Sequence, residues 1–198
     1  MHCEIRLLFI DRDDIFRYAV YIQKEMEGGE IMSLNVFSDA FENGRIREKY
    51  GKMSEDSIQG VPQLSFPVKW EDAPEGTKSF ALVFIDYDNV IGEGIIWVHW
   101  LAANIPAAKT GIEEDAARTD NSFLQGKNTW AFQLGIDNPV CNRYGGPAPE
   151  DRPHEYELHL YALSDMLNLE DGYYYNEFLK ESRGRILDTA VIRGVYGN

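Results

Sequence analysis

The chain has 198 residues, which is enough for one domain with a hydrophobic core and too few for two full ones. Its hydrophobic fraction of 44% and aromatic fraction of 13% are typical of a globular protein rather than a disordered one. The net charge of −14 argues against nucleic acid or an anionic membrane surface as the main partner, because both need clustered Lys and Arg. An acidic surface can still surround a pocket for a small phosphate-bearing ligand.

Cellular location is predicted from the apolar runs and the cysteines. The apolar runs are far shorter than the roughly 20 residues of a membrane-spanning helix, so we expect no integral membrane association. The first residues lack the apolar core of a signal peptide. Cys3 and Cys141 are too few for a disulfide framework. We therefore expect a cytoplasmic protein with free thiols.

The first 31 residues differ from the rest. The short apolar run Leu7–Ile10 is followed by a helix pattern that Asp13 or Asp14 can cap and that Gly28-Gly29 ends. Met32 then opens a new strand-like stretch. We interpret residues 1–31 as an N-terminal extension and residues 32–198 as a single domain. The alternative is that residues 1–31 form the first β-α unit of that domain.

The middle of the chain has the patterns of β-strands. Phe80–Ile85 is an almost unbroken apolar run, and Ile95–Ala103 is rich in β-branched and aromatic residues. Glu155–Leu163 alternates between apolar and polar positions, which indicates a half-buried strand. Residues 104–153 form a long and irregular stretch, and long loops in compact domains are usually functional or mobile.

The C-terminal part predicts a helix over Tyr173–Arg183, ended by Gly184. For Ile186–Val195 the pattern leaves strand and short helix open. Strands that follow one another through turns, without helices between them, predict a mainly β fold. We expect an antiparallel β-sandwich with one or two peripheral helices.

Polar residues gather at or near the ends of these predicted strands. An acid follows the first apolar run, an imidazole lies in the second, and another imidazole opens the third. Strand ends are places where a scaffold can hold polar groups against one another. A Gly-Pro segment ahead of the third strand would let backbone N–H groups approach an oxyanion. The candidate ligand-binding residues are Asp86, Asp88, His99, Gly146, Pro147, His154 and Tyr156.

The same segments, in the same order and spacing, resemble the phosphatidylethanolamine-binding protein family. The resemblance covers residues 32–197, and residues 125–130 are similar to the bacterial Raf-kinase-inhibitor-like branch. It implies a Greek-key β-sandwich with a small anion-binding pocket for phosphate-like groups. The motifs that carry it are Ser65, Trp70, residues 74–79, Asp86-Tyr87-Asp88, His99-Trp100, Asn104-Ile105-Pro106, residues 144–149 and His154-Glu155-Tyr156.

Departures from the family pattern concern the pocket mouth. Tyr87 stands where the family often has proline, and Asn89-Val90 replaces an Ala-Pro pair. A flexible Tyr87 could reach into the mouth. Glu155 follows the second histidine where Arg is common, and this removes a positive charge near the site.

Two imidazoles and a carboxylate, without metal-ligand spacing or an activated nucleophile, favour binding over catalysis. We expect no enzyme activity, no metal and no cofactor, and a role in which ligand binding modulates a partner protein such as a kinase. The alternatives are a hydrolase or metal-dependent enzyme that uses Asp86 as base, and an interaction protein with a vestigial pocket. For Tyr173-Tyr174-Tyr175 the alternatives are a homodimer surface and the packed start of a helix.

Overall fold

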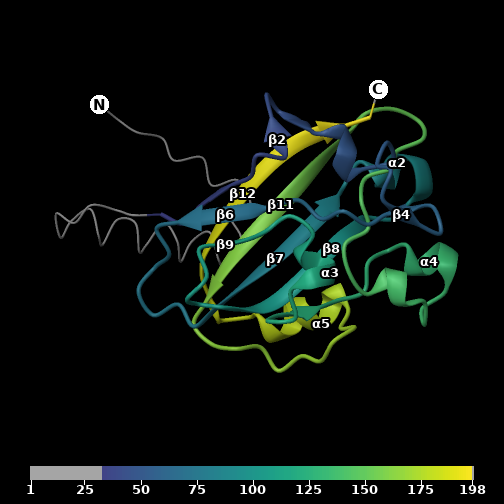
Figure 1. The fold of residues 1–198 in the computed structure, drawn as a ribbon. Coiled ribbons are helices and arrows are strands. Elements are labelled where there is room, and N and C mark those ends of the chain that lie inside the picture. Colours follow the sequence, from purple (N-terminus) through teal and green to yellow (C-terminus); the bar gives the residue numbers. More distant parts are fainter. Residues whose placement is uncertain (1–32, 198) are drawn as a thin grey trace, which may run out of the picture. The chain divides into compact units, whose positions relative to one another are not determined.

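The computed structural model describes residues 33–197, and the expectation for residues 1–31 lies outside this range. Leu34–Asn198 forms one compact unit. Its largest element is a curled sheet of seven strands (Figure 1). In spatial order the strands are β10 (Leu124–Gln125), β8 (Trp97–Pro106), β7 (Ser79–Asp86), β11 (His154–Leu163), β12 (Ile186–Tyr196), β3 (Arg45–Ile46) and β2 (Phe41–Glu42).

Smaller elements surround this sheet. A three-stranded sheet and a two-stranded hairpin accompany four short α-helices and two 3₁₀ helices in residues 33–197. The strands are β1 (Asn35–Phe37), β6 (Val68–Glu71) and β9 (Gly111–Ile112) in the small sheet, and β4 (Ser57–Ile58) and β5 (Val61–Pro62) in the hairpin. The helices are η1 (Glu48–Tyr50), α2 (Asn89–Glu93), α3 (Ala116–Thr119), α4 (Ala131–Leu134), η2 (Pro139–Cys141) and α5 (Tyr175–Glu181).

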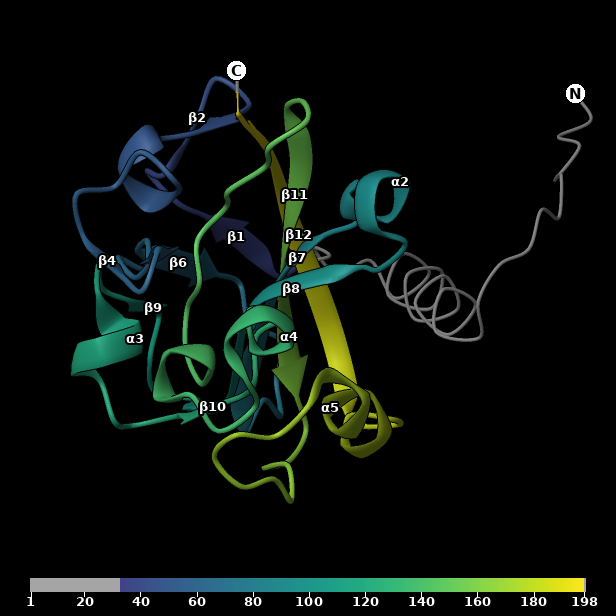
Figure 2. The same cartoon turned by 90° about the vertical axis from the view of Figure 1, so that its right-hand side faces the viewer.

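The large sheet is buried on both faces, and this explains the unbroken apolar run of β7. Phe80, Leu82 and Phe84 point into a core shared with the small sheet. The side chains between them, such as Val83, point to the other face and pack with Phe178 of α5. Alternate residues of a strand face opposite sides, so a strand covered on both sides is apolar throughout. Figure 2 shows the small sheet and α5 on opposite sides of the large sheet.

The mainly β prediction is confirmed, with corrections of detail. β3 pairs with β12 in parallel, so the sheet is mixed rather than antiparallel throughout. The described residues contain four α-helices rather than one or two, because the long stretch 104–153 folds into short elements such as α3 and α4. Ile186–Tyr196 is a strand, which answers the choice left open. The Greek-key connectivity remains a prediction.

Candidate functional site

Strand register brings the candidate residues together. Asp86, at the end of β7, is paired with Tyr156 of β11 on one side and with Trp97 of β8 on the other. His99 lies two residues along β8, and His154 lies two residues before Tyr156. Side chains two residues apart on a strand share a face, so these residues meet at one end of the sheet.

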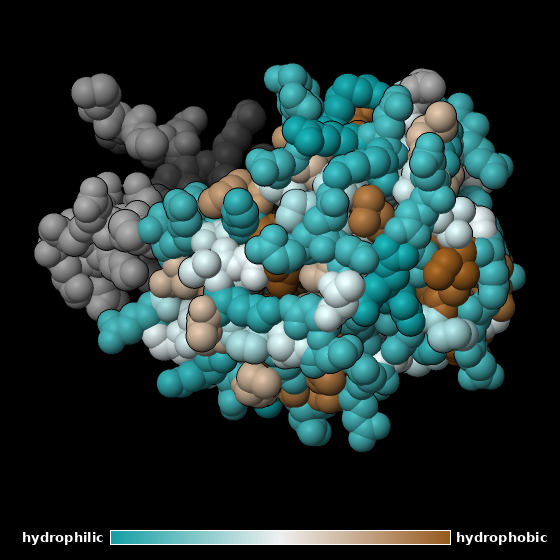
Figure 3. Space-filling view, viewed as in Figure 1, coloured by the Kyte–Doolittle hydropathy of each residue, from teal (hydrophilic) through white to brown (hydrophobic). Residues whose placement is uncertain are grey.

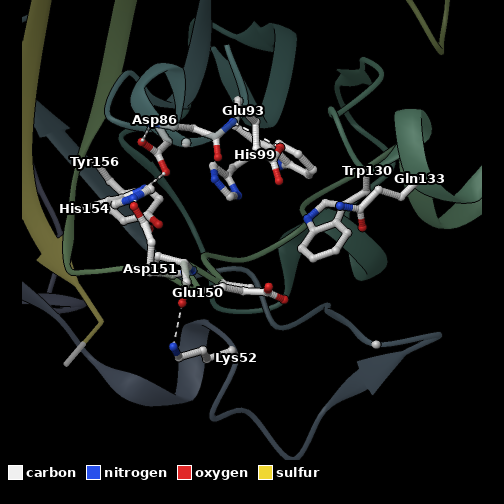
Figure 4. A pocket seen from close by; sticks show the side chains of 16 residues that line it. Lys52, Asp86, Glu93, His99, Trp130, Gln133, Glu150, Asp151, His154 and Tyr156 are labelled. Carbon is white, nitrogen blue, oxygen red and sulfur yellow. Dashed lines mark hydrogen bonds and ion pairs between the residues drawn. The ribbon is translucent and has the colours of Figure 1, made fainter. Parts of the chain in front are cut away.

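A pocket of about 450 Å³ opens at this end (Figure 4). Four of the candidate residues line it: Asp86, His99, His154 and Tyr156. The other lining residues are Trp97, also in β8, and members of five further segments: Lys52, Gly60, residues 89, 92 and 93 in α2, Trp130 with Gln133, and Ala148-Pro149-Glu150-Asp151.

Asp86 is the anchor of the site. Its side chain is buried and accepts a hydrogen bond from the backbone N–H of Asn89 at 3.0 Å. Its other oxygen contacts Nδ1 of His154 at 2.8 Å. The Tyr156 hydroxyl also donates to Asp86, and burial together with this carboxylate raises the pKa of Tyr156 above its ordinary value. A buried carboxylate with several donors is held in one orientation.

His154 is held between two carboxylates. Its Nε2 contacts Oδ1 of Asp151 at 2.9 Å while Nδ1 contacts Asp86. Ionised carboxylates are acceptors, so both contacts are hydrogen bonds only when the ring carries two protons. The side chain of Asp151 is 49% exposed. Slight desolvation raises its pKa, but hydrogen bonds from His154 and from backbone N–H groups outweigh this and lower it.

His99 has the opposite character. Its Nδ1 lies 2.6 Å from the carbonyl oxygen of Gly145, so Nδ1 carries the proton and donates. Burial lowers the pKa of His99 to about 4, although the hydrogen bond to Gly145 acts in the other direction. The ring is therefore neutral at pH 7, and its Nε2 is an acceptor. This buried Nε2 has no hydrogen-bond partner in residues 33–197, and the ring projects into the pocket in Figure 4.

Two indole N–H groups border the same pocket. Trp97 and Trp130 are packed edge to face, with ring centroids 5.3 Å apart. Each Nε1 is buried and lacks a hydrogen-bond partner within the described part of the chain. Buried donors are normally hydrogen-bonded, so two unpartnered ones beside a pocket indicate a place for a ligand acceptor.

The Gly-Pro segment contacts the pocket residue His99 but does not itself line the pocket. The N–H groups of Gly145 and Gly146 donate to the carbonyl oxygens of His99 and Pro62, at 2.9 Å each. Both donors are thus engaged inside the protein, and Gly146 and Pro147 lie outside the lining. Their role as ligand contacts stays a prediction.

Asp88, Tyr87 and Glu155 also lie outside the pocket lining. Asp88 accepts from the backbone N–H of Glu155 at 3.0 Å and faces Arg152 at 3.7 Å, so it joins the ends of two segments. Tyr87 hydrogen-bonds with Tyr175 of α5 and does not reach the pocket mouth. The expectation that Tyr87 reaches into the mouth is therefore wrong, because its side chain is hydrogen-bonded to Tyr175 instead.

The pocket carries more negative charge than the sequence motifs suggested. Four carboxylates line it, on Asp86, Glu93, Glu150 and Asp151, against one ammonium group, on Lys52. The Lys52 ammonium group donates to the carbonyl oxygen of Pro149 at 2.6 Å. Sequence reasoning missed Lys52 and the three outer acids. The spacing Asp151–His154 was a usable signal, since a carboxylate near a histidine often orients it.

Two features are absent from residues 33–197. These residues contain no helix that is long and apolar enough to cross a membrane. They also contain no group of three or more His, Cys, Asp or Glu side chains arranged to hold a metal ion.

Comparison with known proteins gives a consistent family. The family model described as "Phosphatidylethanolamine-binding protein" matches residues 37–197. The Bacillus subtilis protein YxkA is 39% identical over 159 residues, which cover 78% of this chain and 94% of that protein. A Methanothermobacter thermautotrophicus protein of the group UPF0098 is 34% identical and covers 82% of this chain and 98% of its own length.

Solved structures have the same fold. The crystal structure of a protein described as a phosphatidylethanolamine-binding protein homologue from Chlamydia trachomatis has a TM-score of 0.69 and 27% identity. It covers 85% of this chain and 99% of its own. Escherichia coli YbcL, described as a member of the mammalian PEBP family, has a TM-score of 0.68 and 25% identity, over 84% of this chain and 99% of its own.

Proposed function

Because this chain belongs to the phosphatidylethanolamine-binding protein family, we propose that it is a binding protein for a small phosphate-bearing ligand held in the pocket around His99 and His154. The observation that carries the proposal is the buried Nε2 of His99, which lacks a partner in residues 33–197. This acceptor lies beside the unpartnered indole donors of Trp97 and Trp130. A ligand that both donates and accepts hydrogen bonds would satisfy all three groups.

A phosphate group that carries one proton meets this demand. Its P–OH donates to Nε2 of His99, and its other oxygens accept from the indole N–H groups of Trp97 and Trp130. Lys52 adds a positive charge at the same pocket. A phosphate dianion lacks the donor, so its binding requires His99 to gain a proton. In both cases one proton is taken up when a phosphate dianion and the protein with a neutral His99 form the complex.

The geometry favours binding over catalysis. Asp86 already accepts hydrogen bonds from Asn89, His154 and Tyr156. Its side chain therefore orients neighbouring groups and is poorly placed to act as a general base toward a substrate. Modulation of a partner protein such as a kinase, and a cytoplasmic location, are further parts of the proposal.

An NMR titration with phosphorylethanolamine tests the ligand class. We expect the imidazole signals of His99 and His154 and the indole signals of Trp97 and Trp130 to shift at millimolar ligand. The affinity should fall up to about tenfold per pH unit above about pH 6, where the phosphate loses its second proton. Inorganic phosphate and ethanolamine, titrated separately, assign the binding to one end of the molecule.

Two variants sharpen the titration. His99→Gln should abolish the shifts at the pocket. His159→Gln is the matched control, since His159 lies outside the pocket lining and contacts Glu157 at 2.7 Å. Unmoved pocket signals with both phosphorylethanolamine and inorganic phosphate would refute the proposal, as would equal binding by His99→Gln.

A further inference from the structure

The outer faces of α2 and of the segment after it are apolar and uncovered. All five residues of α2 are at least partly exposed. Val90 is 45% exposed, Ile91 is 75% exposed and the nearby Ile96 is 44% exposed. Isolated apolar residues on a surface are ordinary, but several on one short segment mark a surface that contacts something else.

A second apolar group lies on α4 and the turn that follows it. Phe132 is 79% exposed and Ile136 is 50% exposed. Apolar side chains gather at the right-hand edge of Figure 3, where α4 lies in Figure 1. We call these two groups together the mouth rim, and its members are Val90, Ile91, Ile96, Phe132 and Ile136.

The mouth rim borders the pocket through both helices. α2 contributes Asn89, Gly92 and Glu93 to the pocket lining, and Gln133 of α4 also lines it. The five rim residues do not themselves line the pocket, so an occupant of the rim would lie beside the pocket entrance.

The charges at this entrance are negative. Glu93, Glu150 and Asp151 line the pocket, and Glu150 and Asp151 are exposed. The nearby Arg152 lies 3.7 Å from Asp88 and from Asp151, so it offsets only part of this charge. Opposite charges are matched across interfaces, and this determines which partners can approach.

We propose that the mouth rim docks a protein segment in which a Lys or Arg lies between apolar residues. The apolar residues would cover α2 and α4, and the basic side chain would pair with Glu93, Glu150 or Asp151. A second copy of this chain fits less well, because it would bring the same carboxylates to a chain of net charge −14. An anionic lipid surface is disfavoured for the same reason.

Selection from a random 12-residue peptide library displayed on phage, with the full chain as bait, tests the proposal. The enriched peptides should share a Lys or Arg beside Leu, Ile, Phe or Trp. The double variant Ile91→Ser/Phe132→Ser should weaken their binding at least about tenfold, because it removes apolar contact area. Glu93→Gln/Glu150→Gln should weaken it too, and this loss should shrink as salt is added.

Matched controls lie elsewhere on the surface. Leu179→Ser removes an apolar side chain of α5 that is 42% exposed, and Glu75→Gln removes an exposed acid before the opposite end of β7. Both should leave peptide binding unchanged. The proposal is overturned if the enriched peptides are acidic or share no motif, or if they bind the rim variants as well as the wild type.

Two further measurements decide between occupants. Sedimentation from 1 to 100 μM shows whether the chain forms a dimer, and flotation with phosphatidylcholine vesicles shows whether it binds lipid. A dimer or vesicle binding that is lost in Ile91→Ser/Phe132→Ser would assign the rim to that occupant and overturn the proposal. A monomer that ignores vesicles, together with basic-apolar peptides, supports it.

Discussion

His99 and His154 line one pocket, yet their surroundings differ. His154 faces two carboxylates, whereas His99 faces a backbone carbonyl and aromatic rings, with the Tyr156 ring centroid 5.3 Å away. Apolar burial stabilises the neutral form of the His99 ring. The site therefore holds one ring fixed between two carboxyl groups and one ring with an open acceptor, so the two histidines are not interchangeable.

The pKa of His99 predicts how stability depends on pH. In the folded protein the value is about 4, below the 6.5 of an exposed histidine. Between these values the unfolded chain binds the proton and the folded protein does not, so stability is complete above about pH 6.5. It is lost as the pH falls to about 4, by roughly 3 kcal/mol. Urea unfolding at pH 7.0, 5.5 and 4.0 measures this loss.

The comparison for this prediction is His99→Gln. The variant should start less stable, but its stability should fall less between pH 6.5 and 4. The pKa of His159 is also lowered, mainly by burial. His159 is present in both proteins, so its effect on the pH dependence of stability cancels in the comparison. An identical pH slope in the two proteins would contradict the prediction.

Asp86 and Asp151 contact the same imidazole but differ in burial. Asp86→Asn changes a buried group that contacts Asn89, His154 and Tyr156, and we expect the free energy of unfolding to fall by about 1–3 kcal/mol at pH 7. Asp151→Asn should cost much less, because the Asp151 side chain is exposed and water can replace its contact with His154. Denaturant unfolding of both variants under one condition measures the difference. Equal losses of unfolding free energy in the two variants would contradict the prediction that the buried contact contributes more than the exposed one.

At the scale of elements, Gly146 supports the pocket by close packing. A Cβ at this position would lie 2.3 Å from the carbonyl oxygen of Tyr50 and 2.9 Å from Cβ of Pro62. Backbone cannot yield as a side chain can, so Gly146→Ala should destabilise the protein by about 1–3 kcal/mol. The measurement is the midpoint of chemical unfolding.

Gly92→Ala is the matched substitution on the other side of the pocket. Its nearest neighbour would be Oδ2 of Asp151 at 3.9 Å, so there is room for a methyl group. Alanine favours helix over glycine by about 1 kcal/mol, and the change should leave stability equal or slightly higher. Loss of stability in Gly92→Ala, or none in Gly146→Ala, would contradict this account of how the two glycines pack.

Sequence reasoning reached the strands and the central residues of the site because both follow from local patterns. The apolar run of β7 and the alternation of β11 indicate strands directly, and four of the seven candidate residues line the pocket. Lys52 and Trp130 come from segments whose approach depends on tertiary packing, so no local pattern reveals them. The parallel pairing of β3 with β12 joins residues about 150 positions apart, and strands of two residues carry no periodic signal.

At the scale of the whole molecule, aromatic packing unites the two sheets. Trp70 of β6, in the small sheet, packs against Phe80 of β7 with ring centroids 5.0 Å apart. Phe66, just before β6, packs edge to face against Phe84 of β7, also with ring centroids 5.0 Å apart. The tyrosine run is divided between core and surface, since Tyr173 is buried and Tyr174 is 41% exposed. It is therefore not a continuous aromatic surface, and the homodimer stays a prediction.

The position of the core leads to the last prediction. Its members run from Leu34 to Tyr196, and the family match covers residues 37–197. Apolar burial supplies most of the free energy of folding, so a chain that starts at Met32 keeps what it needs to fold. It also keeps the backbone N–H of Leu34, which donates to Asp188 at 2.8 Å. Its free energy of unfolding should lie within about 1 kcal/mol of that of the full chain.

Urea unfolding of the full chain and of residues 32–198 measures this comparison, and the dependence of the free energy on urea adds a second readout. That slope scales with the surface exposed on unfolding. If residues 1–31 were the first β-α unit of the domain, their removal would lower both the stability and the slope, or prevent folding. If they are an extension, the shorter chain should unfold in one transition with a nearly unchanged midpoint and should bind phosphorylethanolamine as the full chain does.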